Sequence, residues 1–130
     1  MKRWMSVLGS SLLMVFPLAA ADDLSGTWAL KTSFEWLPEI VCSFEQAGGE
    51  LTGHCASSQR SLDIVAGRVN ANEITWRLDV SGSAPNGATV SYAFSGTLDR
   101  GRTLVKGTVI GSDASGSFGA RQGTFSASKR

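Results

Sequence analysis

Few side chains in this sequence suit acid–base or nucleophilic chemistry, and they are scattered along the chain. His54 is the only histidine among the 130 residues, and an imidazole is the usual general base near neutral pH. Strand alternation predicts that His54 faces solvent, and the hairpin register assembles no Ser-His-Asp set around it. We therefore expect His54 to be a solvated strand residue, with a general base as the alternative.

Asp63 is the one carboxylate that the same alternation turns inward, near one end of the predicted structure. A buried carboxylate needs a partner, and Arg121 on the last predicted strand is the candidate. The alternative is that Asp63 frays into the loop at 57–61. Together with Tyr92, these residues are the acid–base candidates for an enzyme, although no motif supports catalysis.

The two cysteines predict a disulfide. If Gly48 and Gly49 form a two-residue turn with φ > 0 at both positions, Cys42 lies directly opposite Cys55. The two residues form a pair without backbone hydrogen bonds, where side chains are closest. The bridge closes a loop of about 14 residues and contributes roughly 3 kcal/mol. Two Cys and one His are too few for a zinc site, so we expect no metal and no cofactor.

Aromatic side chains are the candidates for binding an apolar ligand. The connection at 32–39 carries Phe34, Trp36 and Leu37, although long surface connections are usually polar. They form a lid, a contact for a protein partner, or a plug of core residues. The predicted strands turn three more candidates inward, namely Trp76, Tyr92 and Phe94. Together with Phe34, Trp36 and the inward Asp63, they are the six predicted ligand contacts.

The elements that must position these residues are strands. After residue 21 no long helical period appears, and short alternating runs are bounded by Gly, Asn, Asp and Ser. They predict strands at 25–31, 40–46, 51–56, 62–69, 73–80, 89–98, 103–110 and 117–128. Eight strands with mostly hairpin-sized links predict an all-β fold, an eight-stranded antiparallel up-and-down (meander) β-barrel that closes and leaves no exposed edge.

A short unit of the form apolar-x-Gly-x-apolar recurs at 65–69, 94–98 and 105–109. It is strand-sized, too short for a solenoid repeat. An inward glycine lets a strand coil sharply and leaves room for a large neighbour. We therefore interpret these glycines as devices that close a narrow barrel.

The N-terminus has the layout of a secretory signal peptide. Lys2 and Arg3 precede an apolar stretch, which ends in Ala19-Ala20-Ala21 ahead of Asp22. We expect a signal peptide at 1–21, cleaved after Ala21, and a single domain at 22–130 in the periplasm or secreted medium. The stretch is too short for a spanning helix, so no stable membrane anchor is expected.

The charge of the mature part argues against polyanionic partners. Without Lys2 and Arg3, 10 of the 12 basic residues remain against 11 acidic ones. No basic stripe exists, so neither nucleic acid nor an anionic membrane is an expected partner.

Gly26-Thr27-Trp28 and the terminal Lys129-Arg130 resemble the Gly-x-Trp motif and the basic residue of the calycin superfamily. That group includes lipocalins, avidins, fatty-acid-binding proteins and a family of bacterial metalloprotease inhibitors. The resemblance implies that Trp28 plugs one end of the barrel and that a basic side chain packs across it. The order of motifs is most similar to that of short secreted bacterial proteins of the Gly-Thr-Trp type, which implies no particular activity.

Leu51-Thr52-Gly53 also looks like the third strand of avidins. Avidins have polar inward groups after the strand-one Trp and a Tyr two residues beyond this motif. This sequence has Leu30 and Thr32 at the first positions and Cys55 at the second. Biotin binding is therefore not expected.

Three functions are consistent with these patterns. The first is an exported barrel that binds a small apolar ligand, with the Trp36 loop as its lid. The second is a protein-binding inhibitor similar to the metalloprotease inhibitors, which act through an extended N-terminal tail. The third is an enzyme acting on a hydrophobic substrate in the cavity.

Overall fold

A computed structural model describes residues 24–58, 60–83, 86–113 and 119–130. The described part of the chain consists of strands and connections, without a helix. Its strands are β1 (Gly26–Thr32), β2 (Ile40–Ala47), β3 (Glu50–Ala56), β4 (Ser61–Asp63), β5 (Val65–Asn70), β6 (Glu73–Val80), β7 (Val90–Leu98), β8 (Leu104–Asp113) and β9 (Arg121–Lys129). The predicted signal peptide at 1–21 and its cleavage site lie outside the described residues.

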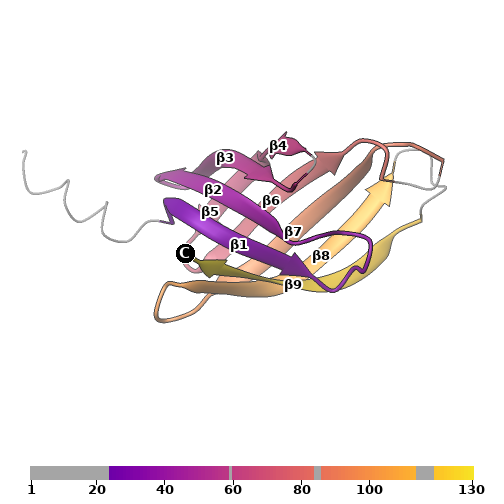
Figure 1. Cartoon of the computed structure of the whole chain (residues 1–130). Coiled ribbons are helices and arrows are strands. Elements are labelled where there is room, and N and C mark those ends of the chain that lie inside the picture. The colour runs from indigo at the N-terminus through magenta and orange to yellow at the C-terminus, as the bar shows by residue number, and fades with distance from the viewer. Residues whose placement is uncertain (1–23, 59, 84–85, 114–118) are drawn as a thin grey trace, which may run out of the picture.

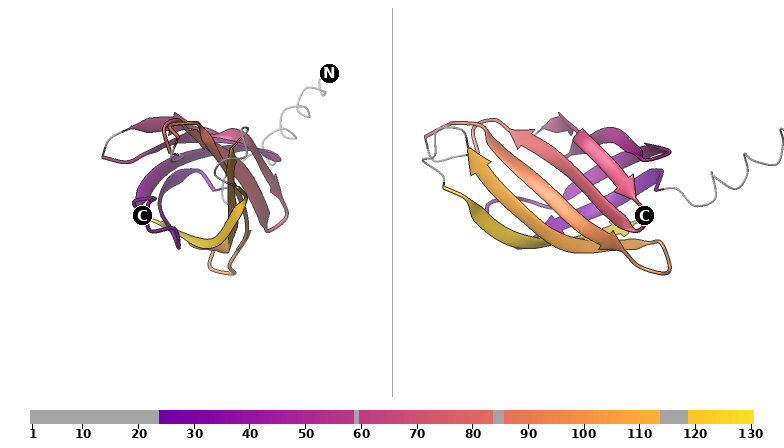
Figure 2. Two further views of the ribbon diagram at one scale, coloured as in Figure 1. Left: turned by 90° about the vertical axis from the view of Figure 1, so that its right-hand side faces the viewer. Right: turned by 180° about the vertical axis from the view of Figure 1, so that it is seen from behind.

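The strands form one antiparallel sheet that closes on itself (Figure 1). Strands that follow one another in the sequence pair, except that β4 and β5 both pair with β3. β1 pairs with both β2 and β9, so the first and last strands meet. Viewed along its axis, the sheet forms a ring (Figure 2, left). The predicted up-and-down barrel is confirmed. No helix in the described ranges is long and apolar enough to cross a membrane.

The fourth predicted strand is interrupted. Pairing changes register between Val65 and Arg68, and Ala66 has a φ of 56°. The strand is thus broken at Ile64 into β4 and β5, with the bulge near the start of β5, and β3 pairs with both segments. Counted as one interrupted strand, they make the eight strands that the sequence predicts.

Two other boundaries differ from the prediction by more than one residue. β8 continues to Asp113, because the residues after Ile110 pair with the first residues of β7. The last strand begins at Arg121 rather than at 117. Residues 117–118 of the predicted strand lie outside the described part.

The β2–β3 hairpin has the predicted register. Cys42 is opposite Cys55, and the pairing runs without a shift to Ala47 and Glu50. The sulfur atoms of Cys42 and Cys55 form the predicted disulfide. One detail of the prediction was wrong. Of the two turn glycines, only Gly48 has a positive φ, 63°, so the turn needs a left-handed residue once rather than twice.

The inward faces form one apolar core with no buried polar or charged residue among those described. The predicted alternation is confirmed on β6 and β7, where every second side chain is buried. Gly96 and Gly107 face each other across β7 and β8. A Cβ atom at Gly107 would overlap the carbonyl oxygen of Ser95, so this glycine allows the two strands to approach closely.

Trp28 lies near the end of the barrel at which β1 begins and β9 finishes. Its side chain is fully buried, and its Nε1 donates a hydrogen bond to the carbonyl oxygen of Leu24 at 2.9 Å. The Nζ of Lys129 lies 5.9 Å from the centre of the Trp28 ring. We call this the closed end, and the opposite end, where β1, β6 and β8 finish, the mouth.

Candidate functional site

The middle of the barrel is filled by aromatic rings. Trp76 and Phe94 are buried and stack with their ring centres 4.9 Å apart. Phe44 packs edge-on against Trp76, and Phe125 packs edge-on against both. The Nε1 of Trp76 is buried and has no hydrogen-bond partner, so its surroundings are apolar. Trp76 and Phe94, two predicted ligand contacts, therefore belong to the core.

The mouth is occupied by the connection at 33–39. Phe34 is only 7% exposed, and its ring lies 6.0 Å from that of Tyr92. Trp36 stacks on the outer side of Phe34 at 4.7 Å and is 45% exposed. The two residues that the sequence treats alike thus differ: Phe34 is a plug, and Trp36 is a partly exposed cover above it.

A hydrogen-bonded pair of side chains holds Trp36 in this position. Its Nε1 donates to the hydroxyl of Tyr92 at 3.0 Å. The same hydroxyl lies 2.8 Å from the Oγ of Ser83, from the connection between β6 and β7. Tyr92 is completely buried. It therefore joins the two loops of the mouth from below, as a structural residue whose hydroxyl is already engaged.

A pocket of about 250 Å³ opens beside Trp36. Three parts of the chain that are distant in the sequence meet there, and most of the side chains that they place around the pocket are apolar. The lining residues are Trp36, Leu37, Pro38, Ile40, Cys55, Ser57, Arg60, Leu62, Val80, Gly82 and Ser83. Of the six predicted ligand contacts, only Trp36 is among them.

Most of this pocket was missed by sequence reasoning. The segments at 57–61 and 81–88 look like ordinary loops, and neither carries a motif. Their convergence depends on how the barrel closes, because the ends of β3 and β6 are brought together only by the strands between them. Leu62 and Val80 offered the only local signal, as apolar residues at strand ends.

Asp63 does not point inward. It is exposed, whereas Leu62 is half-buried and packs against the core. The bulge at Ala66 is the physical reason: it breaks the alternation that would carry Asp63 to the inner face with Val65 and Gly67. The guanidinium of Arg121, its expected partner, lies 5.9 Å from the centre of the Trp36 ring.

The outward position of Asp63 creates a row of three side chains that the hairpin register alone did not predict. On the outer face, Ser43 is the Cα partner of His54, and His54 is the Cα partner of Asp63. The order is that of a catalytic triad, yet no hydrogen bond joins the three side chains, and His54 is exposed on the sheet surface. Without a nucleophile–base hydrogen bond, these residues are not arranged for acyl transfer.

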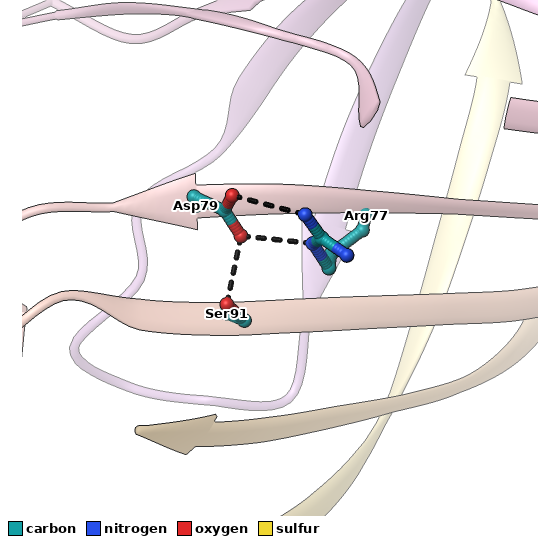
Figure 3. Close-up of polar contacts among 3 residues, drawn as sticks. All are labelled: Arg77, Asp79 and Ser91. Atoms are coloured by element: carbon teal, nitrogen blue, oxygen red, sulfur yellow. Dashed lines mark hydrogen bonds and ion pairs between the residues drawn. The ribbon is translucent and has the colours of Figure 1, made fainter. Parts of the chain in front are cut away.

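The outer faces of β6 and β7 carry one ordered polar cluster (Figure 3). Arg77 Nε donates to Asp79 Oδ1 at 3.0 Å, and Ser91 Oγ donates to the same oxygen at 2.7 Å. These hydrogen bonds, from Arg77 first and Ser91 second, lower the pKa of the Asp79 carboxyl below its usual value. With a serine hydroxyl bound to a carboxylate and no histidine in contact, the cluster braces two strands rather than activating a nucleophile.

No group of three or more His, Cys, Asp or Glu side chains suited to a metal ion occurs in the described ranges. Comparisons of the chain with protein-family models, with curated proteins and with solved structures find no match. The site must therefore be interpreted from its own geometry.

Proposed function

We propose that this protein is an exported β-barrel that binds a small apolar molecule in the pocket beside Trp36. The observation that supports this function best is the pocket itself, with its apolar wall of Leu37, Ile40, Leu62 and Val80. Pockets that bind small molecules are concave and mostly apolar, with a few polar groups at fixed positions. The ligand would lie at the mouth, because aromatic side chains fill the middle of the barrel.

Two further features support the wider assignment. The Cys42–Cys55 disulfide is typical of oxidising compartments and agrees with the predicted signal peptide. The buried Trp28 and the Lys129 side chain across it agree with a calycin-like barrel.

A protein-binding role is the second candidate, and the exposure of Trp36 favours it. Tryptophan is enriched among the residues that dominate protein–protein binding energies. The inhibitor version of this role needs an extended N-terminal tail. Leu24 is buried, and its backbone N–H donates to the side chain of Gln46. Cleavage after Ala21 would leave only Asp22 and Asp23 beyond it, too short a tail.

The uncharged, environment-sensitive dye N-phenylnaphthylamine tests the ligand-binding function. We expect the dye to bind the oxidised protein and to quench the Trp36 indole. Trp36→Ser should weaken dye binding by about tenfold through loss of an aromatic wall. The melting temperature should change little, since Trp36 is half-exposed.

Ile110→Ser is the matched control. Ile110 is 44% exposed, close to the 45% of Trp36, but it lies on the outer face of β8, outside the pocket. Its dye affinity should equal that of the parent. If the protein does not bind the dye, or if Trp36→Ser binds it as well as Ile110→Ser does, the pocket is not a ligand site and the protein-binding role takes precedence.

A further inference from the structure

The wall of the mouth pocket contains one charged side chain. That residue is Arg60, and none of the other residues lining the pocket is acidic or basic. A guanidinium carries five N–H donors in a planar fork that matches a carboxylate, sulfonate or phosphate. The pocket therefore combines an apolar wall with one cationic group.

Arg60 is exposed at the mouth, where one hydrogen bond fixes its backbone and another holds its side chain. Its carbonyl oxygen accepts a hydrogen bond of 2.9 Å from the backbone N–H of Ser57. Its Nη1 donates to the carbonyl oxygen of Ser81, in the connection that follows β6. The side chain thus spans from the β3–β4 connection to the β6–β7 connection, which restricts its rotamers before any ligand arrives.

Among the described residues, no carboxylate forms an ion pair with Arg60. The ion pair found in the described part of the chain joins Arg77 to Asp79, on the outer face of the sheet. Arg60 uses one N–H for the Ser81 carbonyl, so donors remain for an anion. An arginine anchored beside an apolar pocket without a carboxylate partner is a binding group for an anion.

We propose that the ligand is a small amphiphile, an apolar body with one anionic group, and that Arg60 binds that group while the body packs against Trp36 and Ile40. The inference rests on the proposed function and specifies its ligand. Charge-assisted hydrogen bonds to a guanidinium are stronger than neutral ones, and they fix the orientation of the ligand. An uncharged apolar molecule leaves this donor group unused.

The size of the pocket restricts the apolar body. Its volume of about 250 Å³ is slightly below the range of roughly 300–1,000 Å³ typical of small-molecule sites. One or two fused rings, or a short alkyl chain, fit this space. A long acyl chain has no room to continue inward, because Phe34 plugs the entrance to the barrel.

Two dyes that share a fused-ring skeleton test the anionic group directly. Anilinonaphthalene sulfonate carries one negative charge, and N-phenylnaphthylamine is its uncharged counterpart. We expect the parent protein to bind the sulfonate roughly tenfold more tightly. Arg60→Met should abolish this difference and leave the affinity for the neutral dye unchanged. Arg60→Lys, which keeps the charge without the planar fork, should retain part of the preference for the sulfonate.

Arg68→Met is the control for net charge. Arg68 is exposed on β5 and does not line the pocket, so this variant loses the same charge and should retain the preference for the sulfonate. Equal binding of the two dyes by the parent, or equal effects of the Arg60 and Arg68 variants, would overturn the role of Arg60. Those outcomes leave the proposed function intact, whereas failure to bind either dye contradicts both proposals.

A membrane headgroup offers the same anionic chemistry as a free amphiphile. Flotation with phosphatidylglycerol vesicles separates the two sources. We expect the protein to remain unbound while the sulfonate dye occupies the pocket. Retention on the vesicles that is lost in Arg60→Met would assign Arg60 to a lipid surface and overturn the free amphiphile.

Discussion

The tryptophans of the barrel have different roles that depend on their neighbours. Trp28 is fully buried, with its ring N–H satisfied by a backbone carbonyl, and it lies near the closed end. Trp76 is buried in the middle without a partner for its N–H. Trp36 is half-exposed at the mouth, stacked on Phe34 and bonded to the Tyr92 hydroxyl. Of these three, only Trp36 lines the pocket.

Trp28→Ala should lower the free energy of unfolding by roughly 3–5 kcal/mol, because it leaves a large cavity at the closed end. His54→Ala should lower it by less than about 0.5 kcal/mol, since an exposed strand position carries little energy. Urea denaturation of both variants measures the difference. Equal midpoints would contradict the assignment of the two faces.

Asp79 predicts a pH-dependent contribution to stability. Its pKa is lowered in the folded protein by Arg77 and Ser91. The contribution is therefore complete above the usual carboxyl pKa of 3.8 and is lost as the pH falls through the lowered value. Because the pair is exposed, Asp79→Asn should cost less than about 1 kcal/mol at neutral pH.

The same cost should shrink toward zero as unfolding is measured at progressively lower pH, below 3.8. Ser91→Ala, which removes the second donor, should give a smaller version of the same profile. A cost for Asp79→Asn that grows on acidification has the opposite sign and would exclude a stabilising carboxylate.

At the scale of the strands, small irregularities decide which residues reach the pocket. The bulge at Ala66 divides the fourth strand, turns Leu62 toward the core and leaves Asp63 on the surface. Leu62 then lines the pocket beside Val80 at the end of β6. An unbroken fourth strand would instead place a carboxylate near the mouth.

Gly107 tests how tightly β7 and β8 approach. Gly107→Ala should cost roughly 1–3 kcal/mol, because its Cβ would overlap the Ser95 carbonyl oxygen and force the strands apart. Gly101→Ala is the control, since a Cβ there meets its nearest atoms at 3.7 Å. It should be neutral or stabilise the protein by less than about 1 kcal/mol. Thermal unfolding that ranks the two variants equally would argue against a close approach.

For the whole molecule, the buried side chains form one continuous core from Trp28 at the closed end to Phe34 at the mouth. Apart from β4, which pairs only with β3, each strand pairs on both sides along the ring, so these strands cannot separate without breaking a ladder. Such a domain is expected to unfold as one unit.

Urea unfolding of the oxidised protein should therefore give one transition, with coincident midpoints for far-ultraviolet circular dichroism and tryptophan fluorescence. Its slope should be about 1–2 kcal/mol per molar urea, as for other small domains. Repeating the measurement with Trp36→Ser removes the exposed reporter from the mouth. An earlier fluorescence transition in the parent alone would mean that the mouth opens as a separate unit.

The sequence alone determined the barrel, most strand bounds, the pairing of Cys42 with Cys55 and the inward faces. These properties depend on local alternation and turn length, which are encoded by neighbouring residues. The bulge at Ala66, the outward position of Asp63 and the different burial of Phe34 and Trp36 were decided by tertiary packing. The pocket was decided in the same way, because Arg60, Ser83 and Trp36 come from three connections that meet at one end of the closed sheet.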